Sequence, residues 1–444
     1  MHRFDAVARQ VADECAAFVE ARLRAGAPLG ATATPAALRE RLGVTITPAG
    51  LGAAEAFVRF RDVVVPATVG LDSPRFLAFI PAAPTTVSVL FDAVVSACTF
   101  SGESWLEAAG AVHAENEVLR FLADLAGLPA TAGGCFVSGG SAGNLSALAV
   151  ARDTYPAGRG SRRAVVADTA HSSVANALAL LGMEAVIVPT GEDGRLRGDA
   201  VAAVDAPGVC AVVASAGSTN AGVVDALDEV AAVCTARGWW MHVDGAYGAA
   251  ALLVESVRSR FAGIEATDSL IVDPHKWLYG PLDCCALVYR RPELARAVHT
   301  QRAAYLDVLH TDGDGEDLNP ADHAFHLTRR ARGLPVWFSL AVHGTAAYAA
   351  AIGRGLELAR ETAERIRASG PPVELVTEPE LSVVLFRRHG WTADDWVAWS
   401  RGLLADGVAF VTPTRWKGEP VGRLVFLHPA TDLAVVDEIL RRLR

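Results

Sequence analysis

The stretch Ser269-Leu-Ile-Val-Asp-Pro-His-Lys-Trp277 joins a short apolar run to a lysine that stands between a histidine and a tryptophan. Residues 269–272 have the composition of a strand that is buried on both faces of a sheet. Apolar surroundings disfavour the charged form of an amine, and a neutral amine forms Schiff bases. A surface lysine at a turn is the alternative, but Lys276 and Lys417 are the only lysines of the chain. We therefore predict a chemical role for Lys276.

Further apolar runs of strand length alternate with helical patterns between about residues 69 and 345. The predicted strands are 134–137, 164–166, 185–189, 210–215, 239–243, 269–272 and 285–289. The helical patterns between them are 142–151, 173–181, 226–237 and 292–299. This alternation predicts an α/β fold with a mostly parallel, seven-stranded sheet that helices cover on both faces.

Two smaller parts flank this large domain of residues 69–345. Residues 1–68 form a predicted helical arm, because apolar residues recur every three or four positions from Phe4 to Leu23. Such an arm cannot bury its apolar stripe alone, so it packs on the main body or on a second subunit. Residues 346–444 are predicted as a small C-terminal α+β domain with strands at 373–376, 381–386, 409–412 and 423–427.

Composition excludes several classes of protein. The 444 residues are 51% hydrophobic and 20% charged, which excludes a disordered chain and a coiled coil. The net charge of −10 and the lack of basic runs argue against nucleic-acid binding. The longest apolar stretches stop short of the ~20 residues of a membrane span, and the first residues lack a signal-peptide pattern. We expect a cytoplasmic enzyme with reduced cysteines, no metal site and no membrane partner.

Two other segments carry polar groups at the ends of predicted strands. Residues 138–144, Ser-Gly-Gly-Ser-Ala-Gly-Asn, follow a strand and open a helix, so their free N–H groups suit an anion such as a phosphate. A plain tight turn is the alternative. Asp244 ends the strand 239–243 at the edge where α/β proteins bind ligands, although a helix cap is the alternative.

These features together predict pyridoxal phosphate as the cofactor. This cofactor needs an anion cradle, a lysine for its aldehyde and an acid that keeps its ring nitrogen protonated. The chain supplies the cradle, Asp244 and Lys276 in that order. His171, in Ala-His-Ser-Ser at 170–173, adds a flat ring that suits stacking on the cofactor.

The chain resembles the group II pyridoxal-phosphate decarboxylases, which include the aromatic-amino-acid and glutamate decarboxylases. The segments that carry the resemblance are 73–76, 138–144, 170–173, 214–219, 242–247, 273–277 and 410–413. The resemblance implies the type I, aspartate-aminotransferase-like fold and a homodimer. It implies decarboxylation of an L-amino acid, with an aromatic or specialised side chain, through a Lys276 Schiff base and a quinonoid intermediate.

The resemblance also assigns roles to individual residues. The implied catalytic and cofactor-binding residues are Lys276 as the Schiff-base lysine, Asp244 as the partner of the ring nitrogen, His171 and Ala246 on the two ring faces, Gly140, Ser141 and Ser269 at the phosphate, Ser215 near the cofactor hydroxyl, and His275 beside the substrate carboxylate. The implied substrate walls are Phe76, Phe79, Pro81 and Trp105. Asp273 stands where some members have Asn, and we expect its carboxylate to face backbone donors.

One departure from the family concerns the proton donor. The family brings a loop Tyr to the substrate carbon, but its expected position falls near Pro320, and no Tyr occurs between Tyr305 and Tyr348. His323 and His326 are alternative donors near neutral pH, or merely solvated loop histidines. Loss of the Tyr also favours reaction with O2, which would give an aldehyde. Transamination, β-elimination and a noncatalytic cofactor-binding role stay open.

Overall fold

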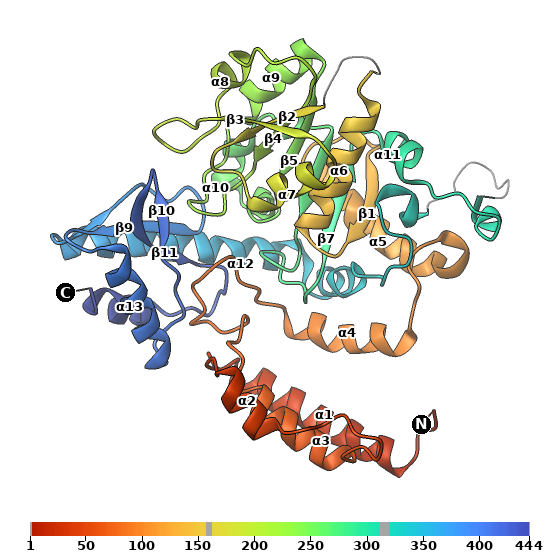
Figure 1. The fold of residues 1–444 in the computed structure, drawn as a ribbon, viewed down its shortest axis with the longest axis vertical. Helices are drawn as coiled ribbons and strands as arrows, with labels where there is room; N and C mark the ends of the chain where they lie inside the picture. Colours follow the sequence, from red (N-terminus) through yellow and green to blue (C-terminus); the bar gives the residue numbers. More distant parts are fainter. Residues whose placement is uncertain (1, 157–161, 311–318, 444) are drawn as a thin grey trace.

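The computed structural model describes residues 2–156, 162–310 and 319–443. Its largest element is a seven-stranded sheet in the order β1-β7-β6-β5-β4-β2-β3 (Figure 1). The strands are β1 (Gly133–Val137), β2 (Arg163–Ala167), β3 (Glu184–Val188), β4 (Val209–Ser215), β5 (Trp240–Asp244), β6 (Ser269–Val272) and β7 (Cys285–Tyr289). Only β7 runs antiparallel to its neighbours. The predicted α/β fold with a mostly parallel sheet is confirmed, because all seven expected strands are present.

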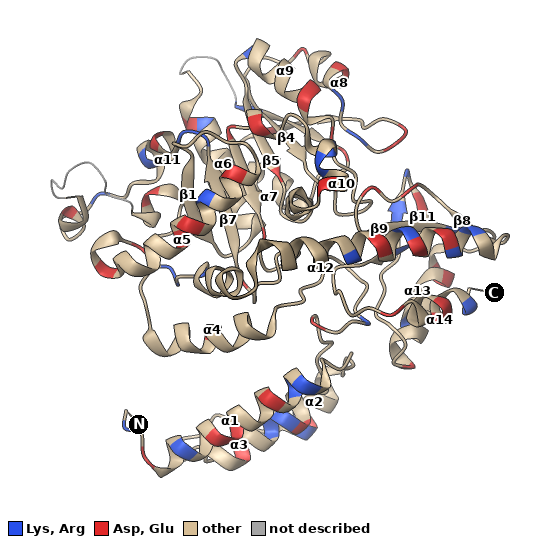
Figure 2. Cartoon of the chain, turned by 180° about the vertical axis from the view of Figure 1, so that it is seen from behind, with Lys and Arg blue, Asp and Glu red and all other residues tan. Residues whose placement is uncertain are grey.

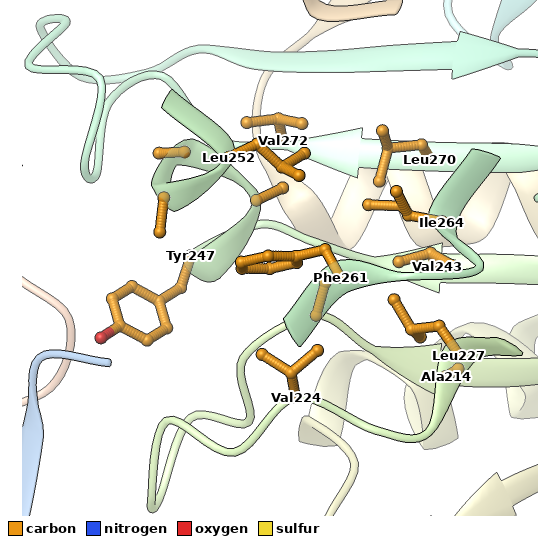
Figure 3. Close-up of a cluster of buried hydrophobic side chains, with 14 of the residues drawn as sticks. Ala214, Val224, Leu227, Val243, Tyr247, Leu252, Phe261, Ile264, Leu270 and Val272 are labelled. Atoms are coloured by element: carbon orange, nitrogen blue, oxygen red, sulfur yellow. The ribbon is translucent and has the colours of Figure 1, made fainter. Parts of the chain in front are cut away.

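Alternate residues of each strand pack into two separate cores, one on each face of the sheet. Val212 and Leu270 pack into the core on one face of the sheet, whereas Val213 and Ile271 pack into the core on the other face. Figure 3 shows part of the first core, where Phe261 lies beside residues of β5 and β6. The side chains of a strand point alternately to the two faces of the sheet, and both faces are buried here. This explains why the strands appear in the sequence as continuous apolar runs.

Helices cover both faces of the sheet. Residues of α6 (Gly140–Thr154), α7 (Ser172–Leu180) and α11 (Pro292–His299) join one core, and residues of α5 (Trp105–Leu125) and α9 (Leu227–Arg237) join the other. The remaining elements of this part are α4 (Thr86–Cys98), α8 (Gly198–Ala202), α10 (Glu255–Arg258), η2 (Gly248–Leu253), η3 (Ser259–Phe261), η4 (Ile264–Ala266), η5 (Asp307–His310) and η6 (Pro320–His323). The sequence analysis missed α4, whose valines favour a strand, and α5.

The C-terminal part contains a four-stranded antiparallel sheet in the order β10-β11-β9-β8. Its elements are α12 (Leu334–Ser369), β8 (Val373–Leu375), β9 (Val383–Arg388), α13 (Ala393–Ala405), β10 (Thr414–Trp416), β11 (Glu419–Val425) and α14 (Leu433–Arg441). The strand predicted at 409–412 is absent, because Phe410 makes only an isolated bridge with Phe76. The domain boundary predicted after residue 345 falls inside α12, next to Gly344, whose φ of +71° interrupts the helix; this boundary stays a prediction.

Helix α12 is long and apolar enough to cross a membrane by length and composition alone. In the structure it packs against α4, α5, β8 and α14, so it connects the two sheets of the protein.

The N-terminal arm consists of α1 (Ala6–Ala25), α2 (Pro35–Leu42), α3 (Ala53–Arg59) and η1 (Phe60–Val64). Figure 1 shows these helices beside one another and set apart from the large sheet. Phe18 contacts Phe57 and Phe60 at ring-centroid distances of 6.0 and 5.8 Å. No described side chain of α1, α2 or α3 is buried, so the arm keeps apolar surface exposed.

Candidate active site

The carboxyl ends of the parallel strands meet at one edge of the large sheet, where a cavity of about 230 Å³ opens. Asp244 ends β5, Ser215 ends β4 and Lys276 follows β6. Eight of the nine residues expected to bind the cofactor line this cavity: Gly140, Ser141, His171, Ser215, Asp244, Ala246, His275 and Lys276. Residues from five separate segments thus converge at one place.

The first turn of α6 forms one wall of the cavity. Its N-cap, Gly139, provides no side-chain cap, so the first N–H groups of a 15-residue helix are available to an anion. Gly143 must be glycine here, because a Cβ atom at this position would lie 2.7 Å from Ile271 Cγ2. The close packing of α6 on β6 therefore brings the N-terminus of α6 to the edge of the sheet.

Asn144 binds the Asp244 carboxylate and orients it. A carboxylate only accepts hydrogen bonds, so the Asn144 amide donates to Asp244 Oδ2 over 3.0 Å. The other side of the amide, Oδ1, then accepts from His242 Nε2 over 2.8 Å. Burial lowers the pKa of His242 to about 4, so its ring is neutral and its Nδ1 accepts from the Ser269 hydroxyl over 2.8 Å.

Two further bonds complete this network. Trp240 Nε1 donates to Ser269 Oγ over 2.8 Å. Asn144 Nδ2 also donates to Ser173 Oγ, which donates in turn to His171 Nδ1 over 2.8 Å. We call Asn144, Ser173, His242, Asp244 and Ser269 the cofactor floor. Each hydrogen bond of the floor has a defined donor and a defined acceptor. The network therefore holds Asp244 and His171 in fixed orientations.

Lys276 does not have the environment that the sequence suggested. Its Nζ lies 2.8 Å from Asp273 Oδ2, and the Asp273 side chain is 2% exposed. Burial disfavours the charged amine, but the attraction of Asp273 and Asp244 outweighs burial, so the pKa of Lys276 is raised above its ordinary value. The prediction of an amine kept neutral by apolar surroundings is wrong. The expectation that Asp273 faces backbone donors is wrong for the same reason, because its carboxylate faces Lys276.

His275 and Ser215 are held by the backbone around them. His275 Nδ1 lies 2.6 Å from the carbonyl oxygen of Cys284, and His275 Nε2 lies 3.7 Å from Asp273 Oδ2. The Ser215 N–H donates to Asp225 Oδ2 over 2.6 Å. Burial raises the pKa of Asp225 to about 7. The backbone of Ser215 and the ring of His275 are therefore held in place in the cavity lining.

The predicted substrate walls lie outside the cavity lining. Phe76, Phe79 and Phe410 form an aromatic cluster with ring-centroid distances of 5.0 to 6.4 Å. Arg423 connects this cluster to the cavity, since its Nη2 donates to the carbonyl oxygens of Phe79 and of Thr219, which lines the cavity. Pro81 is buried in the chain near this cluster, and Trp105 begins α5.

Arg423 is a buried cation that meets no anion in the part of the chain that the structure describes. It is 3% exposed, and no carboxylate of the described residues lies within 4.0 Å of it. The hydrogen bonds that it makes with described residues all go to carbonyl oxygens, and they use Nε and Nη2. Burial lowers its pKa to about 10.

The site fits pyridoxal phosphate on its own geometry. An anion cradle, an oriented carboxylate, an imidazole ring and a lysine amine surround one cavity, and they match the phosphate, ring nitrogen, ring face and aldehyde of this cofactor. The sequence model described as the pyridoxal-dependent decarboxylase conserved domain matches residues 35–389.

The chain belongs to the pyridoxal-dependent decarboxylase family.

Relatives and solved structures agree with this assignment. The chain is 33% identical to the aromatic-L-amino-acid decarboxylase of Bacillus atrophaeus, over 84% of this chain and 81% of that protein. It is 32% identical to the L-2,4-diaminobutyrate decarboxylase of Rhizobium meliloti (strain 1021), over 88% and 81%. The crystal structure of Oryza sativa TDC with PLP and tryptamine has a TM-score of 0.91 at 24% identity, over 100% and 99% of the two chains. The protein is thus an amino acid decarboxylase, and pyridoxal phosphate is its cofactor.

One expected cofactor contact of this decarboxylase is not made. Ser269 begins β6, at the opposite end of the strand from Lys276, and it is fully buried. Its hydroxyl is occupied by His242 and Trp240. The prediction that Ser269 contacts the phosphate is therefore wrong, and Ser269 belongs to the floor instead.

The two loop histidines do not have the properties of proton donors near neutral pH. His323 is 6% exposed, and burial lowers its pKa to about 4. Burial, together with Arg329 and Arg332, lowers the pKa of His326 to about 4. Both rings are neutral at pH 7 and neither lines the cavity. The sequence left two alternatives open, donors near neutral pH or solvated loop histidines. The lowered pKa values argue against the first, and the burial of His323 argues against the second for that residue.

Asn144, Ser173, His242 and Arg423 have roles that the sequence alone did not predict. Each is a polar residue inside an otherwise apolar helix or strand, and this interruption is the signal that could have marked them. Except for the bond from Ser173 to His171, the contacts that define their roles join residues 27 to 344 positions apart, so local patterns do not contain them.

Proposed function

We propose that this decarboxylase converts an aromatic L-amino acid into the corresponding amine. The observation that carries the proposal is the aromatic cluster of Phe76, Phe79 and Phe410, which Arg423 connects to Thr219 in the cavity lining. Phe79 is 56% exposed and Phe76 is buried behind it, so the cluster offers one aromatic face to an incoming ring. Aromatic rings favour contact with one another beyond the effect of buried area.

The proposed roles of the cavity residues follow from their chemistry. When bound, pyridoxal phosphate supplies an aldehyde for the substrate amine and a protonated ring that accepts the electron pair released with CO2. Lys276 would bond to the aldehyde, and Asp244, oriented by Asn144, would hold the proton on the ring nitrogen. His171 and Ala246 would contact the two faces of the ring. The N-terminus of α6, with Gly140 and Ser141, would bind the phosphate.

Arg423 and His275 would flank the place where the substrate carboxylate enters. Arg423 is buried without an anion, and a carboxylate is the group that would satisfy it. His275 lies beside Lys276 and lines the same cavity. Together they would orient the substrate before CO2 leaves.

A second candidate product is an aldehyde. No Tyr occurs between Tyr305 and Tyr348, and Pro320, where the family Tyr was expected, carries no acidic proton. Without a donor for the substrate carbon, O2 could take up the electrons, with release of the aldehyde, ammonia, CO2 and hydrogen peroxide. Oxygen would then be a second substrate.

A homodimer is part of the proposal. The arm exposes Phe4, Val7 and Ile46, and α4 exposes Leu90 and Val94. Figure 2 shows almost no charged residue on α4, in contrast to the arm. A second copy would cover these apolar faces, and sedimentation of a Leu90→Glu/Val94→Glu variant as a monomer would support it. The cytoplasmic location expected from the sequence is part of the same proposal.

The test offers the holoenzyme a panel of aromatic, acidic, sulfur-containing and diamino L-amino acids and follows CO2 and dissolved O2 together. We expect kcat/KM to be at least about tenfold higher for aromatic substrates, because burial of a ring contributes ~1.5–3 kcal/mol. Phe79→Ala should reduce this preference, whereas Leu180→Ala, an exposed residue on α7, should not. Equal rates for all side chains would contradict the aromatic assignment.

The same measurement separates the products. CO2 without O2 uptake supports the amine, and equal amounts of CO2 released and O2 consumed support the aldehyde. Regeneration of the cofactor by added keto acids, without CO2, would instead indicate transamination. A protein without a borohydride-reducible yellow chromophore would be a noncatalytic binding protein.

A further inference from the structure

The two lysines of this chain have opposite surroundings. Lys276 faces the Asp273 carboxylate, which is 2% exposed, over 2.8 Å. Lys417 pairs with Glu192 over 2.6 Å, but the Glu192 side chain is fully exposed and the Lys417 side chain is 37% exposed. An exposed pair contributes little because water screens it, whereas a buried carboxylate strongly favours the charged form of its partner. Asp273 therefore acts on Lys276 far more strongly than Glu192 acts on Lys417.

The position of Asp273 is fixed by its own surroundings. Its backbone N–H donates to Ala246 O, and its carbonyl oxygen accepts from the Lys276 N–H, so Asp273 and Lys276 share one tight turn. Its Oδ1 is buried and has no hydrogen-bond partner among the described residues. The charged and titratable groups around Lys276 are Asp273, Asp244, the Cys285 thiol and, next to Asp273, His275. Two of these are carboxylates, and none is a fixed cation.

We propose that Asp273 is a positioning residue that holds Lys276 as an ammonium whenever this lysine is not bonded to the cofactor. The proposal rests on the proposed role of Lys276 as the cofactor lysine. It follows that a lysine displaced by the substrate amine returns to Asp273 in its charged form.

This arrangement restricts the reaction. A neutral amine beside the substrate would remove the α-proton, and that route converts substrate and pyridoxal phosphate into a keto acid and pyridoxamine phosphate. An ammonium has no lone pair and cannot accept this proton. Asp273 therefore favours loss of CO2 over loss of the α-proton at the same carbon.

The first test measures the two amines in the apoenzyme, without substrate. Trace acetic anhydride is added between pH 6 and pH 11, and mass spectrometry quantifies acetylation of Lys276 and Lys417. We expect the half-reaction pH of Lys276 to lie above that of Lys417 in the wild type. Asp273→Asn should increase acetylation of Lys276 at pH 8 by at least about tenfold, because an adjacent opposite charge moves a pKa by about one to three pH units.

Matched controls belong to the same experiment. Glu192→Gln removes the exposed carboxylate and should change acetylation of Lys417 by less than about threefold. Lys417 reports on folding inside each Asp273 variant, because its rate should stay unchanged. A Lys276 half-reaction pH at or below that of Lys417 in the wild type would overturn the proposal even if Asp273→Asn does not fold. Unchanged Lys276 acetylation in a folded Asp273→Asn protein would also overturn it.

The second test uses the holoenzyme and a substrate that releases CO2. We expect Asp273→Asn to form at least about ten times more of the keto acid that corresponds to the substrate, per CO2, than the wild type, measured by chromatography of the products. An unchanged ratio would overturn the effect on reaction choice. Failure to find any decarboxylated substrate would contradict the proposed function, and the acetylation result would still decide the role of Asp273.

Discussion

The cofactor floor and the substrate side of this decarboxylase differ in completeness. In the floor, Asn144, His242 and Ser269 satisfy one another, and the network ends on the groups that face the cavity. On the substrate side, Phe79 is exposed, and Arg423 is a buried cation without an anion in the described part of the chain. Among the described residues, the hydrogen bonds of the floor are thus completed within one chain. On the substrate side, Arg423 lacks an anionic partner and Phe79 lacks a covering group among the described residues. In the proposed function, the substrate and a second copy of the chain would supply these groups.

This difference follows from where the residues originate. Floor residues stand on strands and helices whose positions are fixed by two cores, so their side chains have little freedom. Substrate-side residues come from a loop before α4, from the loop after β4 and from β11. Such a composite wall changes its shape more easily than the floor, which suits a family that shares one cofactor and differs in substrate.

The largest expected effect is removal of the Lys276 amine on the cofactor side of the cavity. Lys276→Ala should lower kcat/KM for CO2 release by about 10⁴-fold, or ~5 kcal/mol of activation free energy, because the covalent link to the cofactor is lost. Lys417→Ala should be as active as the wild type. Retention of more than a tenth of the activity in Lys276→Ala would show that Lys276 is not the lysine that binds the cofactor.

The next effect concerns the centre of the floor. Asn144→Leu leaves Asp244 and His242 without their shared partner, and an unsatisfied buried group costs about 1–3 kcal/mol. The affinity for pyridoxal phosphate, measured by fluorescence titration, should therefore fall about tenfold to a hundredfold. Asn116→Leu on α5 is the control and should leave this affinity unchanged. If KM for substrate changes and cofactor affinity does not, the two halves are not separate.

A smaller effect is expected on the substrate side. Arg423→Met should raise KM about tenfold, because a charge-assisted hydrogen bond to the substrate contributes about 1.5–3 kcal/mol. Part of this contribution is made both in the bound substrate and in the transition state, so its loss appears in KM. The affinity for pyridoxal phosphate should stay within about twofold. A comparable loss of cofactor affinity would break the distinction between floor and substrate side. Arg415→Met, an exposed residue on β10, is the matched control.

The smallest expected effect is a pH dependence of stability. Burial lowers the pKa of His242 from 6.5 to about 4 in the folded protein, so the unfolded chain takes up a proton first as the pH falls. His242 therefore contributes stability that is present above pH 6.5 and lost as the pH falls towards 4. Thermal unfolding of the apoenzyme across this window should show a steeper decrease of Tm for the wild type than for His242→Gln. Parallel curves would mean that His242 is not held neutral in the floor.

The sequence predicted the elements that local patterns encode. These elements include all seven strands of the large sheet and the motifs around Asp244 and Lys276. Each depends on residues a few positions apart, so the sequence alone predicts it. The predicted charge of Lys276 is wrong because its apolar sequence neighbours suggest a neutral amine. The side chain that decides the charge is Asp273, three residues earlier, whose carboxylate faces Lys276.

The errors at single residues have a common cause. Ser269 was placed at the phosphate, although only the carboxyl end of β6 reaches the cavity and Ser269 begins that strand. The floor around Asn144 and the bonds of Arg423 join distant segments, and no local spacing predicts which of them meet. The arm was predicted as helical, but its exposed apolar face could be described only once the packing of α1–α3 was known.

The scarcity of lysine in this chain makes aldehyde chemistry selective. Aldehydes condense with neutral amines, and the guanidinium groups that carry nearly all the positive charge stay protonated and do not react. Apart from Lys276, the only side-chain amine is Lys417, far along the chain and paired with Glu192. Excess cofactor therefore finds very few places to attach, and a single dye or surface linker aimed at Lys417 would label the holoenzyme in one orientation.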